Sequence, residues 1–410
     1  MEVTRLDIRD LRGFREARLA PSPGLNVITG RNGAGKTSVL EALHLMAYGR
    51  SFRGRVRDSL VRNGASDLEV FVEWRERAPH ALSSVAESTV ESAPDLHERI
   101  RRAGLRHSGQ QWTGRLDGEA VNHLGELCAA LAVVSFEPGS HALVNGPAEV
   151  RRRFIDWGLF HVEPRFLGPW RRYSKALKQR NALLKSRGDD SLLDVWDREL
   201  VEAGEPLSVH RERYLQTLQS GFSTLAGDLA PGLGGVRLEY LAGWKQHELS
   251  LADALLLARS RDRLAGFTSV GPHRADWRVE FGSVPGRDAL SRGQAKLTAL
   301  TALLAQADLH ARVSGDWPVL GFDDLASELD RDHQRKVIDW GLSCGAQVFI
   351  TGTDLPSVLA NKPDRYRLFH VEQGNSQTAQ APIGYTWDTC IHDFSTPPPA
   401  RGCVVGVRFA

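Results

Sequence analysis

Short alternations of apolar and polar side chains characterise the first part of the chain. Val3 to Asp10 alternates in this way, as a half-buried β-strand does, and short strands are also expected between Phe14 and Leu25 and between Asp67 and Trp74. Residues 78–95 are rich in Ser, Ala and Pro without periodicity, which predicts a loop or a mobile insertion. The apolar run from Leu127 to Phe136 indicates a buried segment that ends in a strand.

Helical spacing takes over after Gly146 and Pro147. It continues to about Arg263 and is interrupted by a strand-like segment at 236–241. One expected helix is amphipathic, with apolar residues on one face and basic residues on the other: Leu167, Trp170, Tyr173, Leu177 and Leu184 against Arg171, Arg172, Lys175, Lys178 and Lys185. This segment is therefore predicted to be a helical domain.

Strand patterns return after Phe267, at 277–281 and 318–324, with a long helix expected between them at 294–313. The chain thus returns to the first domain after the helical segment. From Asn375 onward Ser, Gln, Thr, Pro and Gly dominate, which predicts a tail that need not be ordered.

A phosphate-binding loop follows the apolar run Leu25–Ile28. Residues 30–37 match the pattern G-x-x-x-x-G-K-[ST], and the residues expected to hold phosphate are Gly30, Arg31, Asn32, Gly33, Ala34, Gly35, Lys36 and Thr37. Backbone N–H groups of such a loop turn toward phosphate oxygens, the lysine reaches the β- and γ-phosphates, and the Thr37 hydroxyl can ligate Mg²⁺. The preceding strand and the helix expected at 38–45 favour this function over a simple glycine-rich turn.

Two further segments can complete a nucleotide site. The strand at 318–324 ends in Asp323, which can hold Mg²⁺, and Asp324, which can orient or deprotonate an attacking water. Ser291 is placed as the N-cap of the helix at 294–313, where its hydroxyl and the Gly293 N–H can grip a phosphate. The simpler alternatives are a polar turn for the two aspartates and a capped helix start for Ser291.

Composition and charge narrow the class of protein. A chain of 410 residues with 41% hydrophobic content is expected to fold as about two domains. Because no apolar run approaches the ~18 residues needed to span a bilayer and the N-terminus lacks a signal-peptide core, a cytoplasmic location is expected. The four cysteines are scattered, which indicates neither a disulfide framework nor a zinc site. A net charge of +2 means that contact with nucleic acid requires a local basic surface.

Two segments can form such a surface. Between Arg165 and Arg187 there are eight Lys or Arg and no Asp or Glu, and a second basic run lies near the phosphate loop, between Arg50 and Arg62. The absence of acids in the first segment favours phosphate binding over a merely solvated helix face. No base-reading motif is visible, so recognition of shape and backbone is expected. The residues expected to contact DNA are Arg53, Arg55, Arg57, Arg171, Arg172, Lys175 and Lys178.

Taken together, these motifs resemble the head of ABC-type ATPases of the SMC class. The resemblance is carried by the phosphate loop, Leu-Ser-Arg-Gly-Gln at 290–294, Asp323-Asp324 and Leu-Ala-Ser-Glu-Leu-Asp at 325–330. More narrowly, the chain is similar to the RecF family of bacterial recombinational repair proteins from about Val3 to Gly374, with support from 51–53, 62–64, 151–157 and 271–276.

The resemblance implies an α/β fold with two parts. These are an ABC-type P-loop ATPase head with a mixed β-sheet, formed by residues 1–147 and 264–374, and an inserted, mainly helical arm at 148–263, followed by a tail at 375–410. No glutamine matches the usual lid-loop glutamine of such heads, and the tail has no recognised counterpart.

The resemblance also implies a mechanism. ATP and Mg²⁺ would join two heads, with Lys36 and Thr37 of one copy facing Ser291, Gly293 and Gln294 of the other. Asp323 would serve the metal, while Lys36 and Asp324 would be catalytic in a weak, DNA-stimulated ATPase. Similar proteins bind duplex DNA and junctions of double with single strands, cooperate with RecR and RecO, and help to load recombinase.

Alternatives to this interpretation remain open at the level of sequence. A P-loop small-molecule kinase could use the arm as an acceptor lid, although it would not need the segment at 290–294. A transporter motor subunit is disfavoured by the basic arm. His273 and Arg274 are placed either to touch nucleotide or DNA or to cap a turn before a strand.

Overall fold

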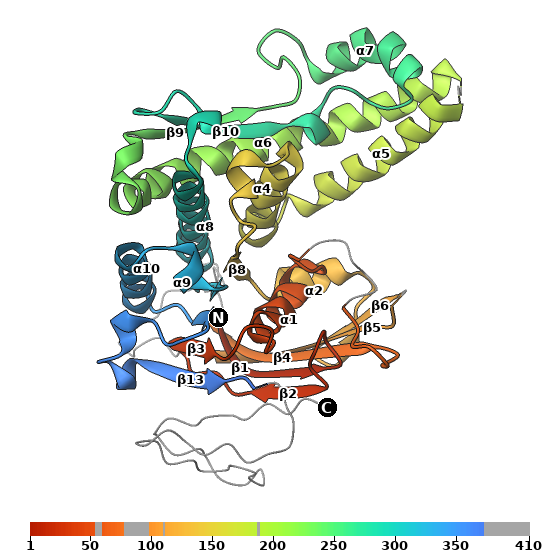
Figure 1. Cartoon of the computed structure of the whole chain (residues 1–410). Coiled ribbons are helices and arrows are strands. Elements are labelled where there is room, and N and C mark those ends of the chain that lie inside the picture. Colours follow the sequence, from red (N-terminus) through yellow and green to blue (C-terminus); the bar gives the residue numbers. More distant parts are fainter. Residues whose placement is uncertain (54–59, 78–97, 110, 187–188, 373–410) are drawn as a thin grey trace, which may run out of the picture. The chain divides into compact units, whose positions relative to one another are not determined.

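Two compact units make up the chain. The computed structural model describes residues 1–53, 60–77, 98–109, 111–186 and 189–372. The head unit comprises residues 1–139 and 314–410, and the arm unit comprises residues 140–313 (Figure 1). The loop predicted at 78–95 and the tail predicted at 375–410 lie entirely outside the described residues.

A parallel sheet forms one layer of the head unit. Its strand order is β13-β3-β12-β11-β8, with bounds Tyr366–His370, Leu25–Thr29, Val348–Gly352, Val319–Phe322 and Val133–Phe136. Strands β3, β11 and β12 are buried along their whole length, as parallel strands covered on both faces are. Because the strands are parallel, the residues that follow them gather at one edge of the sheet.

An antiparallel sheet forms the second layer of the head unit. Its order is β2-β1-β4-β5-β6-β7, with bounds Glu16–Leu19, Glu2–Arg9, Leu68–Arg77, Glu98–His107, Trp112–Leu116 and Glu119–Ala120. Helix α1 (Lys36–Tyr48) contacts β4 of this sheet and both β8 and β12 of the parallel sheet. Its apolar side chains therefore join the two sheets in one core, together with Leu6, Val70 and Phe349. The described part of this unit also contains α2 (Leu124–Ala130), α9 (Leu325–Glu328) and α10 (Arg331–Cys344), with 3₁₀ turns at Ser357–Leu359 and Pro363–Arg365.

The arm unit is mainly helical. Its helices are α3 (Ala142–Asn145), α4 (Ala148–Val162), α5 (Leu167–Ser186), α6 (Asp190–Leu229), α7 (Leu251–Ala265) and α8 (Arg292–Ser314). Strands β9 (Val236–Leu241) and β10 (Asp276–Phe281) form an antiparallel pair, and 3₁₀ turns lie at Pro231–Leu233, Pro272–Arg274 and Arg287–Ala289. Helix α6 has 40 residues, about 60 Å of helix, and packs along α5 (Figure 1).

An ion-pair network inside the arm joins α5, α6 and α7. Arg180 of α5 is fully buried and donates hydrogen bonds to Asp197 of α6 at 2.5 Å and to Asp262 of α7 at 2.7 Å. Arg259 of α7 also reaches Asp197, at 2.7 Å. Breaking such a buried pair typically costs about 3–5 kcal/mol, because the remaining charge stays buried without compensation. The network therefore fixes how the three helices pack.

The mixed α/β head and the helical arm agree with the fold class predicted from the sequence. The grouping of residues 264–313 differs from the expected one, since these residues belong to the arm unit. Strand β10 pairs with β9, and Gln306 of α8 donates to the Phe154 carbonyl at 2.8 Å and to the Tyr214 hydroxyl at 3.0 Å. Within the described residues, no helix is long and apolar enough to cross a membrane.

Candidate nucleotide-binding site

The phosphate loop lies between the end of β3 and the start of α1, where the sequence places it. Three of its glycines, Gly30, Gly33 and Gly35, have φ angles of +153°, +80° and +104°. A Cβ on Gly30 would lie 2.2 Å from the Val371 carbonyl oxygen, and one on Gly35 would lie 3.0 Å from the Phe14 ring. The backbone conformation thus favours glycine at all three positions, and the lack of space also requires it at Gly30 and Gly35.

Lys36 is folded over this loop. Its ammonium donates hydrogen bonds to the carbonyl oxygens of Gly30 at 2.8 Å and Arg31 at 3.0 Å, and the residue is 8% exposed. The first turn of α1 contains no acidic residue, so the positive end of the helix dipole is not offset there. A buried cation and a helix N-terminus therefore face the same loop, which suits a phosphate group.

Two aspartates follow β11 at the same edge of the sheet. Asp323 is 4% exposed, and its carboxylate accepts a hydrogen bond from the Thr351 hydroxyl at 2.7 Å. Burial raises the pKa of the Asp323 carboxyl above its ordinary value, while the hydroxyl groups of Thr351 and Thr37 oppose the rise. Asp324 has the left-handed conformation, with φ of +50°, and its N–H donates to the Thr351 hydroxyl at 2.9 Å.

Thr37 and Asp323 fit a magnesium site. A hydroxyl and a carboxylate are hard oxygen ligands, and Mg²⁺ is commonly bound by one or two carboxylates together with phosphate oxygens. A cation beside Asp323 would also offset the burial of its negative charge. The structure therefore brings together the two residues that the sequence assigned to the metal.

An ion pair links the buried Glu41 of α1 to the half-buried Arg12. Glu41 of α1 is fully buried and accepts hydrogen bonds from Arg12 at 3.0 and 2.7 Å and from the Ser51 hydroxyl. Arg53, which the sequence assigns to DNA, lies 4.0 Å from Glu41 and acts electrostatically on Asp323. Arg53 is thus close to the nucleotide site, whereas Arg55 and Arg57 lie outside the described residues.

The segment at 290–294 belongs to the arm unit and starts α8. The Ser291 N–H donates to the Gln294 side-chain oxygen at 2.9 Å, and the Gln294 N–H donates to the Ser291 hydroxyl oxygen at 3.2 Å. This reciprocal pair is a capping box, so the capped helix start proposed from the sequence is present. The cap uses Ser291 as an acceptor, and both Ser291 and Gly293 are exposed. The hydroxyl can therefore still donate to a ligand.

The basic face of α5 is partly neutralised. Arg171, Lys175 and Lys178 are exposed as expected. Arg172 donates to Glu199 of α6 at 2.7 Å and also pairs with Glu202, and Arg180 is buried in the network described above. The absence of acids in this segment suggested that its positive charges are not neutralised. This is wrong for Arg172 and Arg180, because α6 and α7 supply the acids that pair with them.

His273 and Arg274 form part of a turn inside the arm. Nε2 of His273 lies 2.9 Å from the Thr268 carbonyl oxygen and so donates to it, which leaves Nδ1 to accept from the Tyr173 hydroxyl at 2.8 Å. Burial lowers the pKa of His273 to about 4. Arg274 lies over the Phe267 ring at 5.1 Å. The turn-capping alternative therefore describes His273, whose two ring nitrogens are both engaged.

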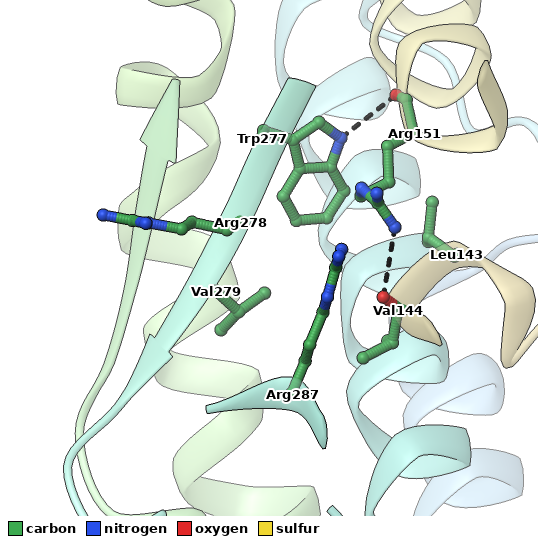
Figure 2. Close-up of a pocket in the computed structure, with 7 residues that line it drawn as sticks. All are labelled: Leu143, Val144, Arg151, Trp277, Arg278, Val279 and Arg287. Carbon is green, nitrogen blue, oxygen red and sulfur yellow. Dashed lines mark hydrogen bonds between the residues drawn. The ribbon is translucent and has the colours of Figure 1, made fainter. Parts of the chain in front are cut away.

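The arginine cluster at 151–153 is also structural in large part. Arg151 is buried and pairs with Asp276 at 2.6 Å, and it donates to the carbonyl oxygen of Val144 at 3.1 Å. Figure 2 shows Arg151 together with Arg287 beside Trp277, whose indole N–H donates to the Arg151 carbonyl at 3.0 Å. The segments 151–157 and 271–276 that carried the resemblance therefore bind each other within the arm.

Comparison with known proteins assigns the family. The model of the RecF/RecN/SMC N terminal domain matches residues 2–377. The DNA replication and repair protein RecF of Stenotrophomonas maltophilia is 62% identical over 373 residues, which cover 91% of this chain and 98% of the relative. The chain belongs to the RecF family. RecF of Xanthomonas axonopodis pv. citri is 60% identical over 374 residues, with the same coverage of both chains.

Solved structures support the same family. The recombination mediator protein RecF–ATPrS in the RecFOR pathway is 25% identical, with a TM-score of 0.74 over 91% of this chain and 96% of that chain. The corresponding RecF–ATP structure is 24% identical, has a TM-score of 0.76 and has the same fold.

Sequence reasoning missed Thr351 and the Arg12–Glu41 pair. Thr351 is a polar residue at the end of a buried strand, at the edge where Asp323 lies, and such a residue is a candidate for the site once the strand order is known. Glu41 is an acid within an otherwise apolar part of α1, which is the signal of a buried charge that requires a partner.

The environment of His273 gives a testable pH dependence. The folded state holds the imidazole neutral, so it should take up a proton only near pH 4, whereas an ordinary histidine does so near ~6.5. The unfolded state therefore binds more protons in this range, and the contribution of His273 to stability is present above about pH 6.5 and is lost as the pH falls toward 4. NMR titration of the histidine rings, with His273→Gln to assign the signal, should give this low midpoint. A midpoint near ~6.5 would contradict the buried arrangement.

Proposed function

We propose that this chain is an ATP-dependent DNA-binding clamp of recombinational repair and replication-fork maintenance. ATP would drive dimerisation on duplex or gapped DNA, slow hydrolysis would release the DNA, and the bound dimer would help to load recombinase. The observation that carries the proposal is the phosphate loop that holds Lys36, together with the buried carboxyl of Asp323, whose pKa the Thr37 hydroxyl lowers. Membership of the RecF family and the ATP-bound relative support it.

The residues of one head would act on the nucleotide in distinct ways. The loop N–H groups and Lys36 would bind the phosphates, and Thr37 and Asp323 would hold Mg²⁺, which neutralises charge on the β- and γ-phosphates. Asp324 would orient the attacking water. Its side chain is one methylene shorter than the glutamate common in ABC-type ATPases, which is consistent with weak hydrolysis that depends on dimer closure and DNA.

A second copy would complete the site. The Ser291 hydroxyl, the Gly293 N–H and the start of α8 can donate to a γ-phosphate, and Gln294 holds Ser291 in place through the capping box. ATP would then join two copies of the chain. This role explains the exposed donors at 291–293, which a small-molecule kinase would not need.

DNA would be contacted by Arg53 in the head unit and by the exposed residues of α5 in the arm unit, namely Arg171, Lys175 and Lys178. Contacts with phosphates alone give little sequence preference. We infer that Arg172 contributes less than these residues, because Glu199 and Glu202 already bind its guanidinium. Partners similar to RecR and RecO are proposed from the RecFOR pathway to which the solved relative belongs.

Two substitutions should separate nucleotide binding from turnover. Lys36→Met removes a charge-assisted contact with phosphate, so ATP affinity should fall at least about tenfold. Asp323→Asn should leave the affinity for metal-free nucleotide largely intact but lower kcat at least about 100-fold, because the metal loses its carboxylate. Equilibrium binding of ATPγS and release of phosphate measure the two effects. Unchanged affinity in the first variant or unchanged kcat in the second would remove the assigned role.

Solution mass tests whether ATP joins two copies. The chain should be a dimer with ATP and a monomer with ADP or without nucleotide, as measured by light scattering. Ser291→Ala should weaken the dimer and its DNA binding by about tenfold, whereas ATP binding by the monomer should persist.

Ser250→Ala is the matched control for Ser291→Ala. Ser250 caps α7 in the same way, with its hydroxyl oxygen accepting from the Asp253 N–H at 3.1 Å, so both variants lose about 1 kcal/mol of helix capping. Equal loss of dimer in the two variants would show that capping, and not nucleotide contact, explains the effect.

The salt dependence of DNA binding tests the α5 face. Replacing Arg171, Lys175 and Lys178 with Ala should lower the slope of log affinity against log salt by up to about 2.7, since each phosphate contact contributes about 0.9. A control variant replaces three other exposed arginines of the arm, Arg198, Arg213 and Arg237, and loses the same charge. The same slope in both variants would assign the effect to overall charge.

A further inference from the structure

Thr351 connects the two aspartates of the nucleotide site. Its hydroxyl donates to Oδ1 of Asp323 at 2.7 Å and accepts from the N–H of Asp324 at 2.9 Å. A single hydroxyl thus serves the side chain of the first aspartate and the backbone of the second. The residue is 1% exposed, so neither hydrogen bond is shared with bulk water.

The position of Thr351 explains how it reaches both residues. Strand β12 lies between β3, which leads into the phosphate loop, and β11, which leads into the aspartates. Its last residues pair with Ile28 and Thr29 on one side, while Ile350 pairs with Phe322 on the other. A β-branched side chain on a buried strand has few χ1 choices, so the hydroxyl is held at one place.

The hydroxyl also supports an unusual backbone. Asp324 has φ of +50° and ψ of 45°, a conformation that residues other than glycine rarely adopt. The N–H of Asp324 donates its hydrogen bond to the Thr351 hydroxyl, and removing this hydroxyl would remove that bond. The hydrogen bond therefore stabilises the turn that sets the direction of the Asp324 side chain, while the bond to Asp323 sets the orientation of the first carboxylate.

We propose that Thr351 is a positioning residue for ATP hydrolysis, which holds the metal-binding carboxylate of Asp323 and the water-orienting residue Asp324 in a fixed mutual geometry. This inference rests on the proposed ATPase function and adds a residue to it. Thr351 acts through the aspartates and needs no contact with nucleotide. Its loss should therefore affect turnover and the contribution of Mg²⁺ more than binding of the nucleotide itself.

The test compares Thr351→Val, Thr351→Ser and a matched control. Thr4→Val is the control, because the Thr4 hydroxyl on β1 of the same unit also donates to a carboxylate, that of Glu73, at 3.1 Å. Thr351→Val should lower kcat about 10- to 100-fold, since misplacement of reacting groups acts on the chemical step. Thr351→Ser keeps the hydroxyl and should stay within about threefold of the wild type, and so should Thr4→Val.

A binding measurement gives a readout besides activity. The affinity for ATPγS is measured by calorimetry in EDTA and in MgCl₂, and the ratio of the two is the enhancement by Mg²⁺. Thr351→Val should keep the affinity in EDTA and lose about tenfold of the enhancement, because Asp323 is no longer held in place. If Val does not fold at this position, Thr351→Cys, whose thiol is a weak hydrogen-bond partner, replaces it.

Three results would overturn the proposal. They are an unchanged Mg²⁺ enhancement in Thr351→Val, a kcat equal to that of Thr4→Val, or a loss in Thr351→Ser as large as in Thr351→Val. A wild type that binds Mg²⁺ and ATPγS without hydrolysing ATP would instead contradict the proposed ATPase, and the Mg²⁺ enhancement would still test Thr351.

Discussion

The parallel pairing of β12 with β3 on one side and with β11 on the other determines the geometry of the nucleotide site. The register places Gly352 beside Thr29 and Ile350 beside Phe322, so the residues that follow each strand emerge at one edge. A shift by one residue would turn the buried side chains of β12 to the other face of the sheet, which the packing on both faces prevents. The positions of the phosphate loop, Thr351 and Asp323 are thus consequences of how the core packs.

The same constraint explains the crowding at the phosphate loop. Strand β13 pairs with β3 on its other side, and the Val371 N–H continues the ladder by donating to the Thr29 carbonyl at 2.8 Å. The Val371 carbonyl then lies against Gly30, where a Cβ would be only 2.2 Å away. Strand β13 and the residue after it therefore close the space beside the loop, and glycine at position 30 is required by a contact with Val371, which lies more than 300 positions later in the sequence.

The sequence predicted those parts of the structure that depend on local order. The phosphate loop, the strand before it and the helix after it are adjacent in the chain, and Ser291, predicted as an N-cap, lies only three positions before its partner Gln294. Partners that come from distant segments could not be predicted. Glu199 and Glu202 approach Arg172 only because α6 packs along α5, and α6 itself continues through Pro206 as one helix, although proline usually ends a helical pattern. Thr351 stands at the end of a buried strand and carries no motif, and only the strand order places it beside Asp323.

Hydroxyl groups connect the functional residues of this chain because each can donate one hydrogen bond and accept others. Thr351 accepts from a backbone N–H and donates to a carboxylate, and Ser291 accepts from the Gln294 N–H while its proton stays available. The Thr37 hydroxyl lies close enough to Asp323 to lower the pKa of its carboxyl, so one metal ion could bind both residues. A methyl group of equal size at any of these positions would preserve the packing but break the connection. The hydroxyl groups of Thr351 and Ser291 therefore link backbone groups, whose positions the packing fixes, to the Asp323 carboxylate and to the phosphate that we propose at Ser291.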